Sequence, residues 1–150
     1  MKLSKVAILS LAVFSTSVLA EGWQTFSVGK GTKSTTVSTD SFSDVFPFTI
    51  GATLHKFDTD IGSKPDMAAD IHFGVGWPAM YATIGLGGVR NKLDGDTDFI
   101  VPISLTGGFL LDENRQFILA PYIAGMVLNG DQEVEVGLKF SYSPRTIPKF

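Results

Sequence analysis

The sequence predicts an all-β protein that folds as a single antiparallel up-and-down β-barrel of eight strands. In segment after segment, apolar residues alternate with polar or small residues at a period of two. No segment beyond residue 20 repeats apolar residues at the helical spacing i, i+3, i+4 and i+7 over three turns. The second face of the alternating segments is mostly Gly, Thr and Ser, which suits the narrow interior of a small barrel.

Length and composition limit the classes of protein to consider. The chain has 150 residues, 44% of them hydrophobic, which suffices for one domain but not for two. It has no Cys, which excludes a disulfide-stapled module and a Cys-rich zinc fold. Its formal net charge of −3 argues against nucleic acid as a partner, because phosphate binding needs a basic surface. The sequence contains no recognisable enzyme motif and predicts no cofactor.

Residues 1–20 have the features of a secretory signal peptide. Lys2 and Lys5 give a positive start, residues 6–14 are almost entirely apolar, and small or tolerated residues end the segment at Ala20. The apolar run is too short to span a bilayer, which needs about 20 helical residues. We therefore expect cleavage after Ala20. The predicted organisation is a signal peptide at 1–20, a barrel domain at 21–142 and a C-terminal tail at 143–150.

The first four predicted strands become more regular along the chain. The second contains one large apolar residue, Val37, and is the weakest of the eight. The third and fourth alternate between apolar side chains and Gly, Thr, Asp or His. These strands cover residues 22–29, 33–40, 45–55 and 67–77.

The last four predicted strands differ in how clearly their apolar face can be told from their polar face. In the fifth and sixth, apolar residues oppose Gly, Thr and Ser, whereas the seventh is apolar on both faces and its register stays open. In the eighth, the apolar residues from Val134 to Tyr142 alternate with small or charged residues. The strands cover residues 80–89, 98–108, 116–127 and 133–142. Because a proline removes a ladder hydrogen bond, three prolines count against these strand assignments unless they lie at bulges or rims. They are Pro47, Pro102 and Pro121.

Two further patterns favour a barrel in a bacterial outer membrane. The predicted links alternate between short turns and longer acidic loops, as periplasmic turns and external loops do in such barrels. The turns are 41–44, 78–79 and 110–115, and the loops include 56–66 and 90–97. Aromatic residues near strand ends suit an interfacial girdle. They are Trp77, Tyr81, Phe99, Phe117 and Tyr142.

Taken together, these features resemble the small bacterial outer-membrane β-barrel proteins of the YfaZ type. The features are the signal peptide, the Gly-rich strand at 84–89, the acidic loop at 92–98 and the final strand through Phe140. The resemblance implies outer-membrane lipid and lipopolysaccharide as surroundings and handling by the outer-membrane insertion machinery. In that family the chain ends at the aromatic residue that closes the last strand. Here a segment with two prolines precedes the terminal Phe150, so its role as an insertion signal stays open.

A polar cluster is predicted inside the barrel. Asp70 and His72 are two residues apart on one strand and therefore point the same way, with Glu133, Glu135 and Lys139 on the polar face of the last strand. A carboxylate can orient an imidazole for acid–base catalysis, but no partnered nucleophile is identifiable. Buried charges persist when they are paired, so we expect a neutralised plug. A separate residue, His55, is expected at a loop mouth in contact with solvent.

The acidic loop contains a calcium-like spacing. Asp94, Asp96 and Asp98 alternate as at the start of an EF-hand, which also needs Gly at its sixth position and Glu at its twelfth. This chain has Phe99 and Leu105 there, so the sequence predicts no dedicated metal site. Weak binding of divalent cations at a lipopolysaccharide surface and ordinary solvated turn residues are the two readings.

The sequence thus predicts a monomeric, non-enzymatic outer-membrane barrel with a lumen filled by side chains. Its acidic loops would serve envelope integrity or surface contacts. One alternative is a soluble periplasmic β-barrel or sandwich that binds a small apolar ligand inside. The other is a lipid-modifying outer-membrane enzyme, which would lose activity without unfolding in His72→Ala.

Overall fold

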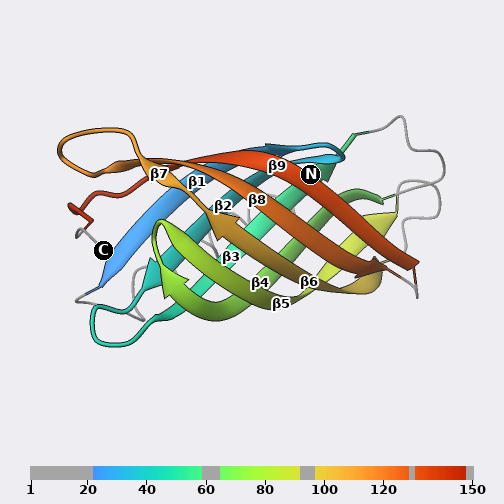
Figure 1. The fold of residues 1–150 in the computed structure, drawn as a ribbon. Helices are drawn as coiled ribbons and strands as arrows, with labels where there is room; N and C mark the ends of the chain where they lie inside the picture. The colour runs from blue at the N-terminus through green and yellow to red at the C-terminus, as the bar shows by residue number, and fades with distance from the viewer. Residues whose placement is uncertain (1–21, 59–64, 92–96, 129–130, 148–150) are drawn as a thin grey trace.

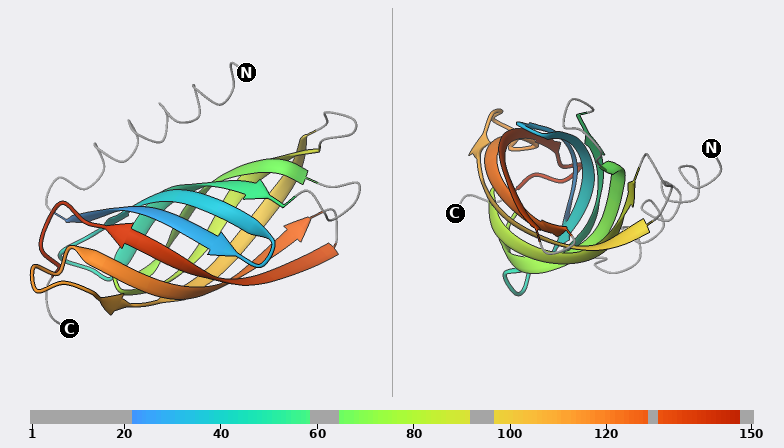
Figure 2. Two further views of the ribbon diagram at one scale, coloured as in Figure 1. Left: turned by 90° about the horizontal axis from the view of Figure 1, so that it is seen from above. Right: turned by 90° about the vertical axis from the view of Figure 1, so that its right-hand side faces the viewer.

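The structure is a computed structural model that describes residues 22–58, 65–91, 97–128 and 131–147. These residues form an antiparallel β-barrel, drawn from the side in Figure 1 and nearly end-on at the right of Figure 2. In the described part of the chain, no helix is long and apolar enough to span a membrane.

The nine labelled strands occupy eight strand positions in the barrel wall. Apart from β6 and β7, which do not pair with each other, each strand pairs with its neighbours in the chain, and β9 pairs with β1 to close the ring. Strands β6 and β7 both pair with β8, so together they occupy one strand position. The predicted eight-stranded up-and-down barrel is therefore confirmed. The strands are β1 (Trp23–Gly31), β2 (Ser34–Phe42), β3 (Phe48–Phe57), β4 (Pro65–Trp77), β5 (Met80–Asn91), β6 (Thr97–Gly107), β7 (Phe109–Leu110), β8 (Phe117–Leu128) and β9 (Asp131–Tyr142).

The weakly patterned second strand is a complete strand of the barrel wall. Strand β2 pairs along its length with β1 and with β3, from Ser34↔Phe57 to Phe42↔Thr49. Its inward residues are mainly polar, and its outward face is less apolar than those of its neighbours. The pattern was weak because both faces of β2 carry Ser and Thr.

The three prolines lie where the ladder is open. Pro47 belongs to the turn at 43–47, so the third strand begins at Phe48 and not at residue 45 as predicted. Pro102 falls in a gap of the β5–β6 ladder, between the pairs Ile84↔Ile103 and Gly87↔Ile100. Pro121 lies opposite the break between β6 and β7. Two of the prolines therefore occupy interruptions within the wall instead of bulges or rims.

The wall is apolar outside and polar inside. Ile71, Val75, Leu86 and Leu138 point outward, and each is more than half exposed. The inward face carries buried Ser, Thr, Asp, His and Glu side chains around the middle of the barrel. This distribution is the reverse of that in a water-soluble domain.

The two ends of the barrel differ. At one end, called the turn end, the links are 43–47, 78–79 and 111–116, and strand β9 leads into the tail (left in Figure 1). At the other, called the loop end, β3, β5 and β8 finish and β4, β6 and β9 begin. Strands β3, β4 and β5 extend into the loops predicted at 56–66 and 90–97, so these loops are shorter than expected.

Apolar layers close the lumen above and below its polar middle. At the loop end, Ala68, Val89, Ile100 and Met126 form a buried cluster, against which Phe57 packs. At the turn end, the tail folds back so that Ile147 is fully buried against Ile118 and Ala120. Hydrogen bonds hold the tail there, from Ile147 N to Arg115 O at 3.0 Å and from Trp23 Nε1 to Thr146 O at 3.1 Å.

Candidate functional site

A chain of polar side chains crosses the middle of the lumen, and we call it the lumenal network. Strand alternation points each member inward, and the members come from five different strands, β2, β3, β4, β5 and β9. In order of contact they are His55, Asp70, His72, Asp40, Tyr81 and Lys139.

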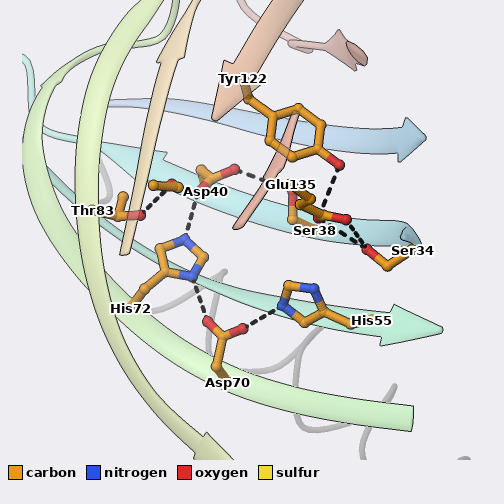
Figure 3. Close-up of polar contacts among 10 residues, drawn as sticks. Ser34, Ser38, Asp40, His55, Asp70, His72, Thr83, Tyr122 and Glu135 are labelled. Atoms are coloured by element: carbon orange, nitrogen blue, oxygen red, sulfur yellow. Dashed lines mark hydrogen bonds and ion pairs between the residues drawn. The ribbon is translucent and has the colours of Figure 1, made fainter. Parts of the chain in front are cut away.

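His72 is the centre of this network. Its Nε2 lies 2.7 Å from Oδ1 of Asp40, and its Nδ1 lies 3.0 Å from Oδ1 of Asp70 (Figure 3). The other oxygen of Asp70 lies 2.8 Å from Nε2 of His55. An ionised carboxylate only accepts hydrogen bonds, so His72 satisfies both carboxylates by donating from both ring nitrogens, as an imidazolium does.

Register and a glycine make the Asp40–His72 contact possible. Asp40 pairs with Gly51 on β3, and Gly51 pairs with His72 on β4, so the two polar side chains meet across a strand that offers no side chain. A Cβ at Gly51 would lie 2.6 Å from Nε2 of His72 and 2.7 Å from Oδ1 of Asp40. Gly51 is therefore part of the site, since any larger residue would push the pair apart.

The network continues to the opposite wall through Tyr81. Lys139 Nζ donates to Tyr81 Oη at 3.0 Å, and Tyr81 Oη donates to Oδ2 of Asp40 at 3.4 Å. The Lys139 ammonium also lies 5.4 Å from the centre of the Tyr81 ring and 6.0 Å from that of Tyr122. Two carboxylates are thus balanced by an imidazolium and an ammonium across the barrel.

A second polar group lies beside the lumenal network. Glu135 accepts hydrogen bonds from Ser34 Oγ at 3.0 Å and from Tyr122 Oη at 3.2 Å. Two glycines leave room for this group, because a Cβ at Gly31 or at Gly137 would lie 2.6 Å from atoms of Tyr122. The two polar groups therefore fill part of the lumen with side chains that bond to one another.

The predicted polar cluster divides into three parts. Asp70 and His72 contact each other, and Lys139 reaches them only through Tyr81 and Asp40. Glu135 belongs to the second group. Glu133 forms an ion pair with Lys33 at the loop end, where both are about one-third exposed.

Two expectations for single residues were wrong. His55 was expected in contact with solvent, but it is 6% exposed and bonded to Asp70, because its position on β3 points inward. Tyr81 was expected in an aromatic girdle, but it is 4% exposed in the lumen. Among the other girdle candidates, Phe99, Phe117 and Tyr142 are exposed on the outer face.

Sequence reasoning missed Asp40, Tyr81 and Tyr122 as partners of the predicted residues. The alternation on β5 did place Tyr81 on the polar face, opposite Met80 and Ile84. Asp40 follows Ser34, Thr36 and Ser38 at the same parity, which was an available signal for an inward position. Tyr122 had no such signal, because its strand is apolar on both faces.

The arrangement suits charge neutralisation better than catalysis. The side chains of Asp40, His55, Asp70 and His72 are at most 7% exposed. Two hydroxyls contact Asp40, Tyr81 Oη at 3.4 Å and Ser38 Oγ at 3.5 Å, and among the described residues neither is hydrogen-bonded to the imidazole of His72. Within the described residues, no group of three or more His, Asp or Glu side chains could hold a metal ion. Of the predicted cation ligands, Asp94 and Asp96 lie outside the described residues, and Asp98 is half-buried on β6.

Comparisons with known proteins give a similarity in structure but none in sequence. No protein-family model matches the sequence, and no curated protein matches it. The fold is similar to that of the Yersinia pestis outer membrane protein Ail, whose backbone structure was determined in a phospholipid bilayer nanodisc. The two chains are 12% identical, the match covers 82% of this chain and 99% of Ail, and the TM-score is 0.49.

Proposed function

We propose that this closed barrel is a non-enzymatic protein of a bacterial outer membrane, with a structural or surface-contact role. The observation that carries the proposal is the exposed apolar wall. Every strand of the wall carries at least one large apolar side chain on its outward face. Val28, Ile71, Leu105, Ile123 and Val136 are examples, and each is more than half exposed. Such a surface is unfavourable in water and suits the hydrocarbon of a bilayer.

Aromatic residues near the turn end support the same placement. Phe117 stacks against Phe140 with ring centres 5.7 Å apart, and its ring centre lies 5.2 Å from that of Tyr142. Phe109 nearby is 71% exposed. Aromatic side chains are enriched at the boundary between hydrocarbon and headgroups, so these residues would lie at the periplasmic interface.

The packed lumen supports a role other than transport. Within the described residues, the lumenal network and the two apolar clusters occupy the interior, which supports a barrel without a continuous aqueous path. Contacts with other molecules would then be made at the loop end, which faces outward if the short turns are periplasmic. The strand ends that flank the loops predicted as acidic, 56–66 and 90–97, lie there.

The inside-out distribution also argues against a soluble protein that stores an apolar ligand. A soluble ligand-binding barrel is apolar inside and polar outside. Here the middle of the lumen is occupied by buried carboxylates with polar partners: Asp40 and Asp70 contact His72, and Glu135 accepts hydrogen bonds from hydroxyl groups.

Fractionation of cells that express the full chain tests the proposal. We expect the protein in the outer-membrane fraction, and we expect the folded form to migrate differently from the heated form in a detergent gel. Recovery from the soluble periplasmic fraction, without any heat-dependent shift, would contradict the proposal and return the soluble barrel to first place.

A further inference from the structure

A single row of outward-facing side chains crosses the wall near the loop end, and we call it the basic row. Strand register defines it, because each member is the Cα partner of the next from β1 to β5. In the described wall, the three outward-facing cations all belong to this row. Its members are Lys30, Thr35, Lys56, Met67 and Arg90.

The cations of the basic row are not equivalent. Lys30 Nζ lies 2.8 Å from the carboxylate of Asp58 and is neutralised by it. Lys33, in the adjoining β1–β2 turn, is paired with Glu133. Lys56 and Arg90 are exposed, and neither has a hydrogen bond or an ion pair with any residue that the structure describes. Among the described residues, two positive charges therefore have no partner at one level of the wall.

Lys56 and Arg90 are placed to bind one anion together. Met67 lies between them as the Cα partner of both, so their backbones are two strands apart, about 10 Å. Both side chains point outward and are long enough to converge over Met67. A guanidinium and an ammonium that meet on one group are the usual partners of a phosphate.

The outer surface next to this pair, towards the turn end, is apolar and carries small side chains. In the next outward row towards the turn end, Ala69 pairs with Gly88, so the wall has almost no side chain there. Ile71 and Leu86 continue the surface below them, and both are about half exposed. An acyl chain can lie along this strip, whereas a free phosphate ion gains nothing from it.

We propose that Lys56 and Arg90 bind the phosphate of a lipid whose acyl chain lies along β4 and β5. In the orientation proposed above, the loop end faces outward, where the phosphorylated lipid is lipopolysaccharide. The acylated, phosphorylated lipid A part of lipopolysaccharide is therefore the ligand to which we commit. This inference rests on the proposed membrane insertion and adds a specific lipid contact to it.

The test compares two double variants that remove the same charge. K56Q/R90Q removes the uncompensated pair, and K30Q/K33Q removes the two lysines that are already paired with Asp58 and Glu133. Each barrel is folded in phosphatidylcholine nanodiscs and titrated with lipid A, and the bound fraction is measured by native mass spectrometry. We expect K56Q/R90Q to raise Kd about tenfold or more and K30Q/K33Q to change it by about twofold or less.

Three results would overturn the proposal. Equal weakening in both double variants would mean that only the general positive charge matters. Unchanged binding in K56Q/R90Q would place the lipid elsewhere. Complete displacement of lipid A by millimolar inorganic phosphate would indicate a site for the free ion. The single variants K56Q and R90Q, each expected to weaken binding about threefold or more, serve if the double variant does not fold.

The two proposals fail in different ways. Absence of the wild-type protein from the outer membrane would end the proposed function. A wild-type protein that inserts, shows the heat-dependent shift and binds lipid A no better than K56Q/R90Q would end only the lipid-site proposal.

Discussion

Single residues of the lumenal network are arranged so that each of its buried carboxylates, Asp40 and Asp70, meets the imidazole of His72. Asp70 accepts hydrogen bonds from two imidazoles, and Asp40 lies between His72 and the Tyr81–Lys139 pair. Desolvation makes an unpaired charge costly at such a position, and pairing offsets this cost. The removal of one partner should therefore have a much larger effect than the loss of a surface ion pair.

The substitution Asp70→Asn tests this expectation. It leaves both imidazoles without their shared carboxylate, and we expect the free energy of unfolding to fall by about 3 kcal/mol. Asp58→Asn is the matched control, because Asp58 pairs with Lys30 at the surface and should contribute less than about 1 kcal/mol. Urea titration in detergent micelles, followed by the fraction of protein with folded gel mobility, measures both. Equal losses would contradict a stabilising role of the lumenal network.

Two glycines on neighbouring strands provide a second test at this scale. A Cβ at Gly137 would lie 2.6 Å from the Tyr122 ring and from the Lys30 carbonyl, whereas a Cβ at Gly125 would meet nothing within 4 Å. We expect Gly137→Ala to lower the free energy of unfolding by about 1–3 kcal/mol through overpacking. Gly125→Ala should change it by about 0.5 kcal/mol or less. The same urea titration decides, and a neutral Gly137→Ala would show that the Tyr122 niche is loosely packed.

Among the elements, the C-terminal tail has the clearest separate role. Ser143 N donates to Gln116 O at 2.7 Å, and Arg145 Nη1 donates to Gly22 O at 3.1 Å, so the tail joins the β7–β8 link to the start of β1. Ile147 then fills the turn end of the lumen. The prolines that prevent a continuation of β9 leave this segment free to turn inward.

Truncation of the Ile147 side chain tests the role of the tail. We expect Ile147→Ala to destabilise the barrel by about 2–4 kcal/mol, because the side chain is fully buried against Ile118 and Ala120. The neighbouring Thr146→Ala keeps the carbonyl that accepts the Trp23 indole hydrogen bond and should change stability by about 0.5 kcal/mol or less. Tryptophan emission during urea titration reports on both variants. A neutral Ile147→Ala would mean that the tail only rests on the barrel.

At the scale of the whole molecule, an apolar wall surrounds a paired polar interior. Closure of the sheet by the β1–β9 pairing satisfies the strand edges without water, which a hydrocarbon environment requires. The same closure creates an interior narrow enough for side chains from opposite walls to touch. The exposed wall and the lumenal network are therefore two consequences of one topology.

A charge placed on the wall distinguishes a membrane protein from a soluble one. We expect Ile71→Arg, at the middle of the apolar face, to make folding into vesicles less favourable by about 2–4 kcal/mol. Val45→Arg, in the turn beyond the wall, should cost about 0–1 kcal/mol. The fraction inserted into phospholipid vesicles across a urea series measures the difference. In a soluble protein both exposed positions would tolerate Arg equally.

The sequence by itself determined the fold class, the strand number and the inward face of most strands. These properties follow from alternation along single strands, which is local information. Asp70 and His72 were predicted together for the same reason, because they are two residues apart on one strand. The resemblance to YfaZ-type proteins remains a prediction.

Only the tertiary structure decided which side chains meet across the barrel. The Asp40–His72 contact depends on the register of three strands and on Gly51 between them, and the Tyr81–Lys139 contact depends on closure of the ring. The inward direction of Tyr122 depends on the space left by Gly31 and Gly137. Such contacts join residues that are distant in the chain. Alternation within a strand carries no information about partners on the opposite wall, because strand register and ring closure determine which side chains meet there.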